Sequence, residues 1–234
     1  ISAMKGLTLF ILFSFPPFLL FSQAKYDYVW TLGYGDTLTV PSNGISIGGI
    51  TMDFNTEPPT LTRIPFLCSP MACISDQNGR LLAYTNGCSI YNREHKEMLN
   101  GDDINPGKVH KEFCGYNSAW YPGWQGCLFL PMPGKSDSIY CLLHLRRNDK
   151  NWRTEQLLIT TIGTHADNGL GGVIKKNELV FSDKDTLLSV YLTATRHANG
   201  RDWWVLVPRS YPPDFHLFLL DPSGIHYQGT QTLG

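Results

Sequence analysis

One stretch of the chain carries oxygen-bearing side chains at a spacing that could hold a cation. In residues 74–92, ISDQNGRLLAYTNGCSIYN, Asp76, Asn78 and nearby backbone carbonyls could serve as calcium ligands. A helix-flanked calcium loop would continue with regularly spaced oxygens and a closing acidic residue, whereas Gly79 is followed here by Arg-Leu-Leu-Ala-Tyr. Because Asn-Gly is also a strong hairpin signal, we predict a hairpin turn at residues 76–79 and no metal site.

A second cluster of chemically capable side chains is THADNGLGG, residues 164–172. His165 lies close in sequence to the carboxylate of Asp167, and such a pair could act as a general base or bind a metal. The alternative is a glycine-rich turn between strands, in which Asp167 and Asn168 bond their own backbone. The sequence contains no His-Glu-x-x-His motif. We favour the turn.

A third polar segment is RHANGRDWW, residues 196–204. Asn199-Gly200 predicts a reversal of the chain, with charged side chains on both sides of it. The segment could form a polar ligand-binding loop, or its side chains could simply bond the neighbouring backbone. We retain His197 and Arg201 as candidate ligand-binding residues.

An aromatic-rich loop, CGYNSAWYPGWQG, covers residues 114–126. Flat aromatic rings in a loop can stack on the apolar faces of sugars or anchor a protein partner. Alternatively, the rings cover hydrophobic core and are fixed by a disulfide between Cys114 and Cys127 that closes the loop. The candidate ligand-binding residues of this loop are Tyr116, Trp120, Tyr121 and Trp124.

Six cysteines follow the N-terminal segment: Cys68, Cys73, Cys88, Cys114, Cys127 and Cys141. An even number in an exported chain favours disulfides, and six cysteines allow fifteen complete pairings. A zinc site would need closely spaced pairs, whereas the two nearest cysteines here have four intervening residues. We expect structural disulfides or buried thiols, and neither a metal nor another cofactor.

Short apolar segments that could position these loops recur along the chain, separated by turn residues. Strands of five to eight residues are predicted for LLAYTNG, CSIYN, CLFLPMPG, SIYCLLHL, EQLLITTIG, LLSVYLTAT, DWWVLVPRS and FHLFLLDPSG. Asn-Gly and Pro-x-Gly sequences between them supply the backbone angles of tight turns. The pattern therefore predicts an all-β fold of antiparallel sheets.

The strands also form units that repeat about every forty to sixty residues. The units begin near Pro70, Trp124 and Leu187, and each contains strand, glycine-containing turn, strand and a further strand. Such repeats are typical of β-propeller blades. Because propellers carry four to eight blades and only about three to four are visible here, we expect an incomplete ring whose remaining residues lie beyond Gly234.

The N-terminal segment predicts export. After Met4, Lys5 is followed by an apolar run from 7 to 21 and by Ser-Gln-Ala, the pattern of a secretory signal peptide cleaved after Ala24. Pro16-Pro17 argues against a membrane-spanning helix. Residues 1–3 resemble upstream read-through or a cloning remnant. The mature domain would be residues 25–234, with no membrane span after cleavage.

The charge balance excludes one class of partner. The chain has 19 Lys and Arg against 20 Asp and Glu, and no basic block interrupts it. The positive surface expected of a nucleic-acid-binding protein is therefore missing.

Several segments in this order resemble secreted β-propeller proteins of Bacteroidota. They are ISDQNGRLLAYTNGCSIYN at 74–92, MLNGD at 98–102, LFLPMPGKSDSIYCLLH at 128–144, NGLGGVIKKN at 168–177 and TATRHANGRDWWVLVP at 193–208. The resemblance spans roughly residues 26–234. It implies the N-terminal part of a seven-bladed or similar propeller with WD40-like repeats. It also implies export and release or surface display, often through a type IX secretion sorting domain or a gliding-motility-associated C-terminal domain, neither of which is present here.

These features favour a non-catalytic binding or scaffold module, secreted or displayed at the outer-membrane surface, with a protein or glycan ligand. The resemblance supplies no catalytic residues. The alternative is an extracellular polysaccharide hydrolase or lyase with its site at the propeller axis, which would require Asp76, Asp167 and Asp202 to point into one pocket.

Overall fold

Antiparallel strands make up most of the chain that the computed structural model describes, which comprises residues 24–33, 49–64, 72–114, 120–123, 125–187, 191–209 and 214–232. Fourteen strands and two short helices fall within these ranges. The all-β prediction is therefore confirmed. The described residues do not form a closed ring of sheets.

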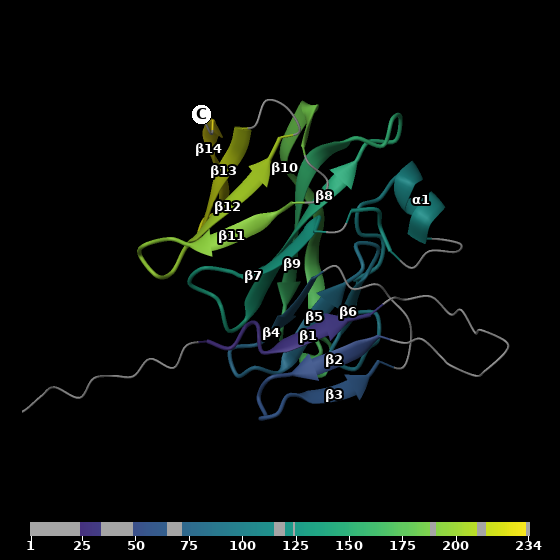
Figure 1. Cartoon of the computed structure of the whole chain (residues 1–234), viewed down its shortest axis with the longest axis vertical. Helices are drawn as coiled ribbons and strands as arrows, with labels where there is room; N and C mark the ends of the chain where they lie inside the picture. The colour runs from purple at the N-terminus through teal and green to yellow at the C-terminus, as the bar shows by residue number, and fades with distance from the viewer. Residues whose placement is uncertain are drawn as a thin grey trace, which may run out of the picture.

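Each of the four sheets consists of strands that follow one another in sequence (Figure 1). The first sheet contains β1 (Val29–Leu32), β2 (Ile50–Asp53) and β3 (Thr60–Arg63). The second contains β4 (Ala72–Ser75), β5 (Leu81–Thr85) and β6 (Ile90–Asn92). The third contains β7 (Cys127–Pro131), β8 (Ile139–Arg147), β9 (Thr154–Gly163) and β10 (Gly172–Leu187). The fourth contains β11 (Thr193–Arg196), β12 (Trp203–Pro208), β13 (Asp214–Asp221) and β14 (Gly224–Thr232).

The third sheet is buried on both faces. Successive side chains of a strand point to opposite sides, so Leu142 and Leu143 of β8 enter different cores. Leu142 packs with the second sheet, in a cluster that includes Ile74 and Ile90. Leu143 packs with the fourth sheet, in a cluster that includes Val205. The second, third and fourth sheets are thus stacked face to face, which explains why β7 and most of β8 are nearly continuous apolar runs.

The first strands of the first three sheets lie side by side. β4 contacts β1 on one side and β7 on the other. The backbone N–H of Val29 donates to the hydroxyl of Ser75 over 2.9 Å, and Thr31 N lies 3.4 Å from the sulfur of Cys73. Because residue numbers rise along β1 as they fall along β4, these two neighbouring strands run in opposite directions.

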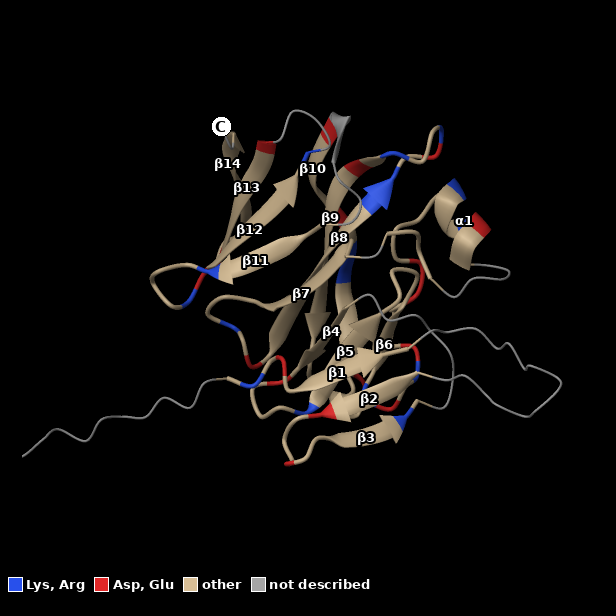
Figure 2. Ribbon diagram, viewed as in Figure 1, with Lys and Arg blue, Asp and Glu red and all other residues tan. Residues whose placement is uncertain are grey.

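Charged residues lie mainly in the turns and at the strand ends, so that most strand interiors are tan in Figure 2, with the charged stretch of β10 as an exception. Basic and acidic segments alternate around the molecule in that view. The turns therefore carry most of the polar chemistry, and the strands hold the turns in place.

The structure describes little of the predicted N-terminal segment. Most of the predicted signal peptide, residues 1–23, lies outside the described ranges. Among the described residues, no helix is both long and apolar enough to cross a lipid bilayer.

Candidate functional site

Four turns at one end of the sheets surround two neighbouring hollows. These turns are the β4–β5 turn (residues 76–80), the β7–β8 turn (132–138), the β9–β10 turn (164–171) and the β11–β12 turn (197–202). We call this end of the molecule the turn surface. The larger hollow lies between the second and third sheets, and the smaller one between the third and fourth.

The β4–β5 turn is organised by the carboxylate of Asp76. One carboxylate oxygen accepts hydrogen bonds from the backbone N–H groups of Asn78 at 2.8 Å and Arg80 at 3.0 Å. The other oxygen lies 2.8 Å from the guanidinium of Arg80. Gly79 adopts the positive φ of 83° that the turn requires. The predicted hairpin turn is therefore confirmed, and the oxygens of Asp76 are occupied by their own loop.

The β9–β10 turn confirms the second turn prediction. β9 ends at Gly163 and β10 begins at Gly172, so THADNGLGG connects two antiparallel strands. Asp167 and Asn168 both have positive φ, which short polar side chains tolerate best after glycine. The exposed ring of His165 has its Nδ1 atom 2.9 Å from the hydroxyl oxygen of Thr164. Within the described residues, no group of three His, Cys, Asp or Glu side chains could hold a metal ion.

The larger hollow, which we call the Tyr140 hollow, has a volume of about 450 Å³. It is lined by Asp76, Gln77, Asn78, Arg80, Leu82, Arg93, Asp137, Tyr140, Thr164, His165 and Gly169. Two carboxylates and two guanidinium groups are among them, so the formal charges balance. The guanidinium of Arg93 donates to the backbone carbonyl of Gly169 over 2.5 Å, which joins the end of β6 to the β9–β10 turn.

Tyr140 stands at the wall of this hollow as the second residue of β8. Its side chain is 1% exposed, and its ring packs edge-on against Tyr26 with 6.2 Å between centroids. No described group makes a hydrogen bond of ordinary geometry with its hydroxyl. Burial raises the pKa of the phenol, with Tyr26, Asp76 and Asp137 adding to the rise and the backbone of Gln77 opposing it. The hydroxyl therefore keeps its proton at neutral pH and can both donate and accept.

The smaller hollow, which we call the Trp203 hollow, has a volume of about 340 Å³ and shares Asp137 with its neighbour. The guanidinium carbon of Arg196 lies 4.3 Å from the ring centroid of Trp203, and the same side chain donates to the backbone carbonyl of Gly200 over 2.7 Å. Arg201, a predicted ligand-binding residue, lines this hollow. Its guanidinium is paired with the carboxylate of Asp202 at 2.7 Å.

Asp202 is held by the turn that it follows. Its carboxylate accepts hydrogen bonds from Arg201 and from the side chain of Asn199. The hydrogen bond from Arg201, supported by Asn199, lowers the pKa of Asp202 to about 2. His197, the other candidate of this segment, packs against Trp204 with 5.3 Å between ring centroids. Trp204 points to the opposite face of β12 from Trp203, so His197 does not line the Trp203 hollow.

The aromatic loop lies at the other end of the sheets. Tyr121 is 2% exposed, packs with Cys88 and Val109, and accepts a hydrogen bond from the backbone N–H of Arg147 over 2.9 Å. It is therefore a core residue, in agreement with the alternative interpretation of the loop. Trp120 is half-buried beside it, whereas Tyr116 and Trp124 lie outside the described residues. The six predicted ligand-binding residues thus do not form one site.

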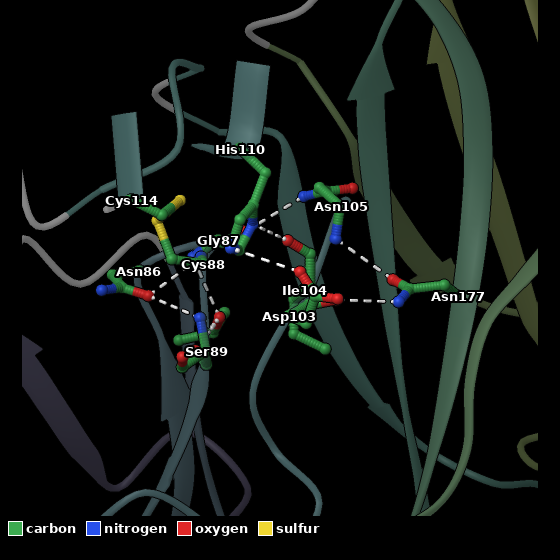
Figure 3. The surroundings of a disulfide bond; sticks show 11 residues. Asn86, Gly87, Cys88, Ser89, Asp103, Ile104, Asn105, His110, Cys114 and Asn177 are labelled. Carbon is green, nitrogen blue, oxygen red and sulfur yellow. Dashed lines mark hydrogen bonds and ion pairs between the residues drawn. A yellow bond between two sulfur atoms is a disulfide. The ribbon is translucent and has the colours of Figure 1, made fainter. Parts of the chain in front are cut away.

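The predicted disulfide between Cys114 and Cys127 is wrong. Cys114, the last residue of helix α1 (Lys108–Cys114), is bonded to Cys88 in the β5–β6 turn (Figure 3). Cys127 begins β7 and is buried as a free thiol in the core between the second and third sheets. Cys73 and Cys141 are also free thiols, and Cys68 is not among the described residues. Nearness along the chain suggested the wrong partner because α1 turns Cys114 towards the second sheet.

A buried polar network joins the second sheet to the third near this disulfide. The side chain of Asn105 donates to the backbone carbonyl of Gly87, and its backbone N–H donates to the side chain of Asn177 (Figure 3). His144 lies behind it, with Nδ1 2.7 Å from Asn105 Oδ1 and Nε2 3.0 Å from the hydroxyl of Thr160. Burial lowers the pKa of His144 to about 3. This neutral, saturated network fixes a loop and offers no group to a ligand.

Asn177 reaches this network because of a bulge in β10. Lys175 pairs with Thr161 and Glu178 pairs with Ile159, so two residues of β10 lie opposite Thr160 alone. Asn177 has a positive φ of 57° in the bulge. The helix α2 (Ala166–Gly169), at the start of the same hairpin, is only the single turn of the β9–β10 connection.

None of the eleven residues that line the larger hollow is among the six predicted ligand-binding residues, and one serine motif is also absent from the predicted sites. Tyr140 and Arg93 belong to no sequence motif, and alternation along β8 predicts only that Tyr140 is buried. Residues 44–48, GISIG, have a Gly-x-Ser-x-Gly spacing and lie outside the described residues.

No family model matches the chain, and neither the curated proteins nor the solved structures that were searched contain a match. We therefore infer function from the sheets and from the turn surface.

Proposed function

We propose that the chain is a non-catalytic binding or scaffold module of the β-propeller type that acts outside the cell. The observation that carries this proposal is the face-to-face stacking of successive antiparallel sheets, with β4 and β7, the first strands of two of them, side by side. Propeller blades are sheets of this kind packed around an axis.

The outer faces of the two end sheets support the same proposal. On the first sheet, Trp30 and Leu32 are 48% and 41% exposed and point away from the second sheet. On the fourth sheet, Leu217 and Leu219 are half-buried and point away from the third. In a ring of four to eight blades, each of these apolar faces would meet a further sheet.

Action outside the cell is supported by two independent features. The N-terminal segment has the pattern of a signal peptide. The bond between Cys88 and Cys114 is of the kind that persists in oxidising compartments. Both features agree with the resemblance to secreted propellers of Bacteroidota, from which we infer release or display at the outer-membrane surface.

Binding without catalysis is supported by the positions of the three carboxylates that an enzyme would need. Asp76 lines the Tyr140 hollow, whereas neither Asp167 nor Asp202 lines either of the two hollows. Asp76 and Asp202 are each neutralised by an arginine of their own turn. A carboxylate in such a pair is a poor acid, and because only Asp76 of the three lines one of these hollows, the three do not converge on one glycosidic bond.

The proposal is tested with the secreted form of the chain and with soluble polysaccharides. Export should cleave the chain after Ala24, which N-terminal sequencing of the extracellular protein measures. The purified protein should retain a polysaccharide or a protein on an affinity column without releasing reducing ends. Release of reducing ends that is lost in the Asp76→Asn variant would overturn the proposal in favour of the hydrolase.

A further inference from the structure

The Tyr140 hollow has the size and the walls of a small-ligand site. Its volume of about 450 Å³ is within the range of roughly 300 to 1,000 Å³ that ligand pockets occupy. Three turns from two sheets meet around it, and each is fixed before any ligand arrives. Arg80 is held by Asp76, Arg93 by the carbonyl of Gly169, and Thr164 lies within hydrogen-bond distance of the carbonyl of Ser138. Such a preformed rim lowers the entropy that binding costs.

The hydroxyl of Tyr140 is buried without a hydrogen bond of ordinary geometry, and the backbone of Gln77 is a group that interacts with it. Buried polar atoms normally have hydrogen-bond partners, and each exception calls for an explanation. Here the hydroxyl lies just beneath the wall of the hollow, next to the turn that carries the exposed side chains of Gln77 and Asn78. The hydroxyl itself is buried, so a ligand in the hollow reaches it only when side chains of the wall move aside.

The charges around the hollow select against an ionic ligand. The carboxylates of Asp76 and Asp137 balance the guanidinium groups of Arg80 and Arg93. An anion would meet Asp137, and a cation would meet Arg93. A protonated phenol donates one hydrogen bond and accepts another, and an alcohol group does the same, so an uncharged polyol satisfies it best.

We propose that the Tyr140 hollow binds an uncharged sugar unit of a glycan, with the hydroxyl of Tyr140 making a hydrogen bond to a sugar hydroxyl at its wall. This inference rests on the proposed binding function and names its ligand class and its site. The Trp203 hollow beyond Asp137 then receives the next part of the glycan chain.

The test uses the secreted, disulfide-bonded chain and saturation-transfer NMR with hexasaccharides of one length. The neutral probes are cellohexaose, laminarihexaose and mannohexaose, and the charged probe is hexagalacturonate. At least one neutral probe should bind more tightly than hexagalacturonate. Tyr140→Phe removes only the hydroxyl and should weaken that binding about three- to tenfold. Asn78→Trp fills the hollow while leaving Tyr140 in place, and should abolish it.

The matched control is Tyr227→Phe, which makes the same chemical change on β14 at a residue that lines neither hollow, and it should bind the probe as the parent chain does. Equal binding by the parent chain and by both hollow variants would overturn the site but leave the proposed binding function standing. Binding of hexagalacturonate but of no neutral probe would overturn the ligand class. Deglycosylated gelatin serves as a protein probe, and binding of it but of no saccharide would also overturn the ligand class. Cleavage of a probe would instead overturn the proposed function itself.

Discussion

Two buried tyrosines differ in what their hydroxyl groups do. The hydroxyl of Tyr121 accepts a hydrogen bond from the backbone N–H of Arg147. The hydroxyl of Tyr140 has no described partner of ordinary geometry. The same substitution at the two positions therefore separates a structural phenol from one that is available to a ligand.

We predict that Tyr121→Phe lowers the free energy of unfolding by about 1 to 2 kcal/mol, because it removes the hydrogen bond that the hydroxyl accepts from the backbone N–H of Arg147. Tyr140→Phe should leave the free energy of unfolding unchanged or raise it, because it removes a polar atom that is buried without compensation. Urea denaturation of the two variants measures both values. A loss for Tyr140→Phe as large as that for Tyr121→Phe would show that its hydroxyl is satisfied within the fold.

The buried surroundings of His144 favour the neutral form of its ring. Asn105 Oδ1 accepts from Nδ1–H, and Nε2 accepts from the hydroxyl of Thr160. The oxygen of that hydroxyl already accepts from the backbone N–H of Asn177. A proton on Nε2 would require the Thr160 hydroxyl to turn and accept a second hydrogen bond, and the charge would lie in a site that burial keeps from water.

The lowered pKa of His144 predicts a pH dependence of stability. The folded-state pKa is about 3, whereas an unfolded histidine titrates near 6.5. Between those values the unfolded chain binds more protons, so stability should fall as pH falls through this window. Urea midpoints at pH 7.5 and 5.0 should differ less in His144→Gln than in the parent chain. An imidazolium signal from His144 in the folded protein at pH 5.0 would contradict this prediction.

At the scale of elements, the sequence predicts strands best where apolar runs end in tight turns. β7, β9 and β12 lie within the segments predicted for them, give or take one residue. β10 is not predicted, because Lys175, Lys176 and Asn177 interrupt its apolar pattern at the bulge. The first sheet is also missed, since its strands are only four residues long and β3 is exposed along its whole length.

The sequence predicts the chemistry of single turns but not the meeting of distant ones. The roles of Asp76 and Asn199 follow from local rules, because these side chains bond the backbone within four residues of themselves. The Tyr140 hollow and the Cys88–Cys114 bond depend on how sheets and a helix are placed in space. The spacing of residues along the chain does not predict that placement.

The disulfide should stabilise the connection between the β5–β6 turn and α1. Its two cysteines are 26 residues apart, and cross-linking a loop of that length restricts the unfolded chain by about 3 kcal/mol. We therefore expect the Cys88→Ala, Cys114→Ala double variant to lose about that much in urea denaturation. Dithiothreitol should lower the parent chain to a similar stability and leave the double variant unchanged. A double variant as stable as the oxidised parent would contradict the prediction.

At the scale of the whole molecule, the third sheet links its two neighbours. Leu142→Ala and Leu143→Ala open cavities on opposite faces of the same strand, and each should cost about 2 to 5 kcal/mol. If the stacked sheets unfold together, both variants should shift one common transition, measured by tryptophan fluorescence and by circular dichroism. The control Leu179→Ala, at a position 59% exposed on β10, should stay within about 0.5 kcal/mol of the parent. An unchanged Leu143→Ala variant would mean that the fourth sheet does not pack there.

The same stacking hides two reduced sulfur atoms. Cys127 and Cys141 enter different cores of the third sheet, and burial raises the pKa of each thiol to about 12. A buried thiol with such a pKa does not ionise at neutral pH and is not accessible to an oxidant. Until the neighbouring sheets close over them, however, both are ordinary reactive cysteines that can compete for Cys88 or Cys114. In the proposed oxidising surroundings, the Cys88–Cys114 bond therefore forms correctly only if the sheets stack faster than Cys127 or Cys141 reacts with Cys88 or Cys114.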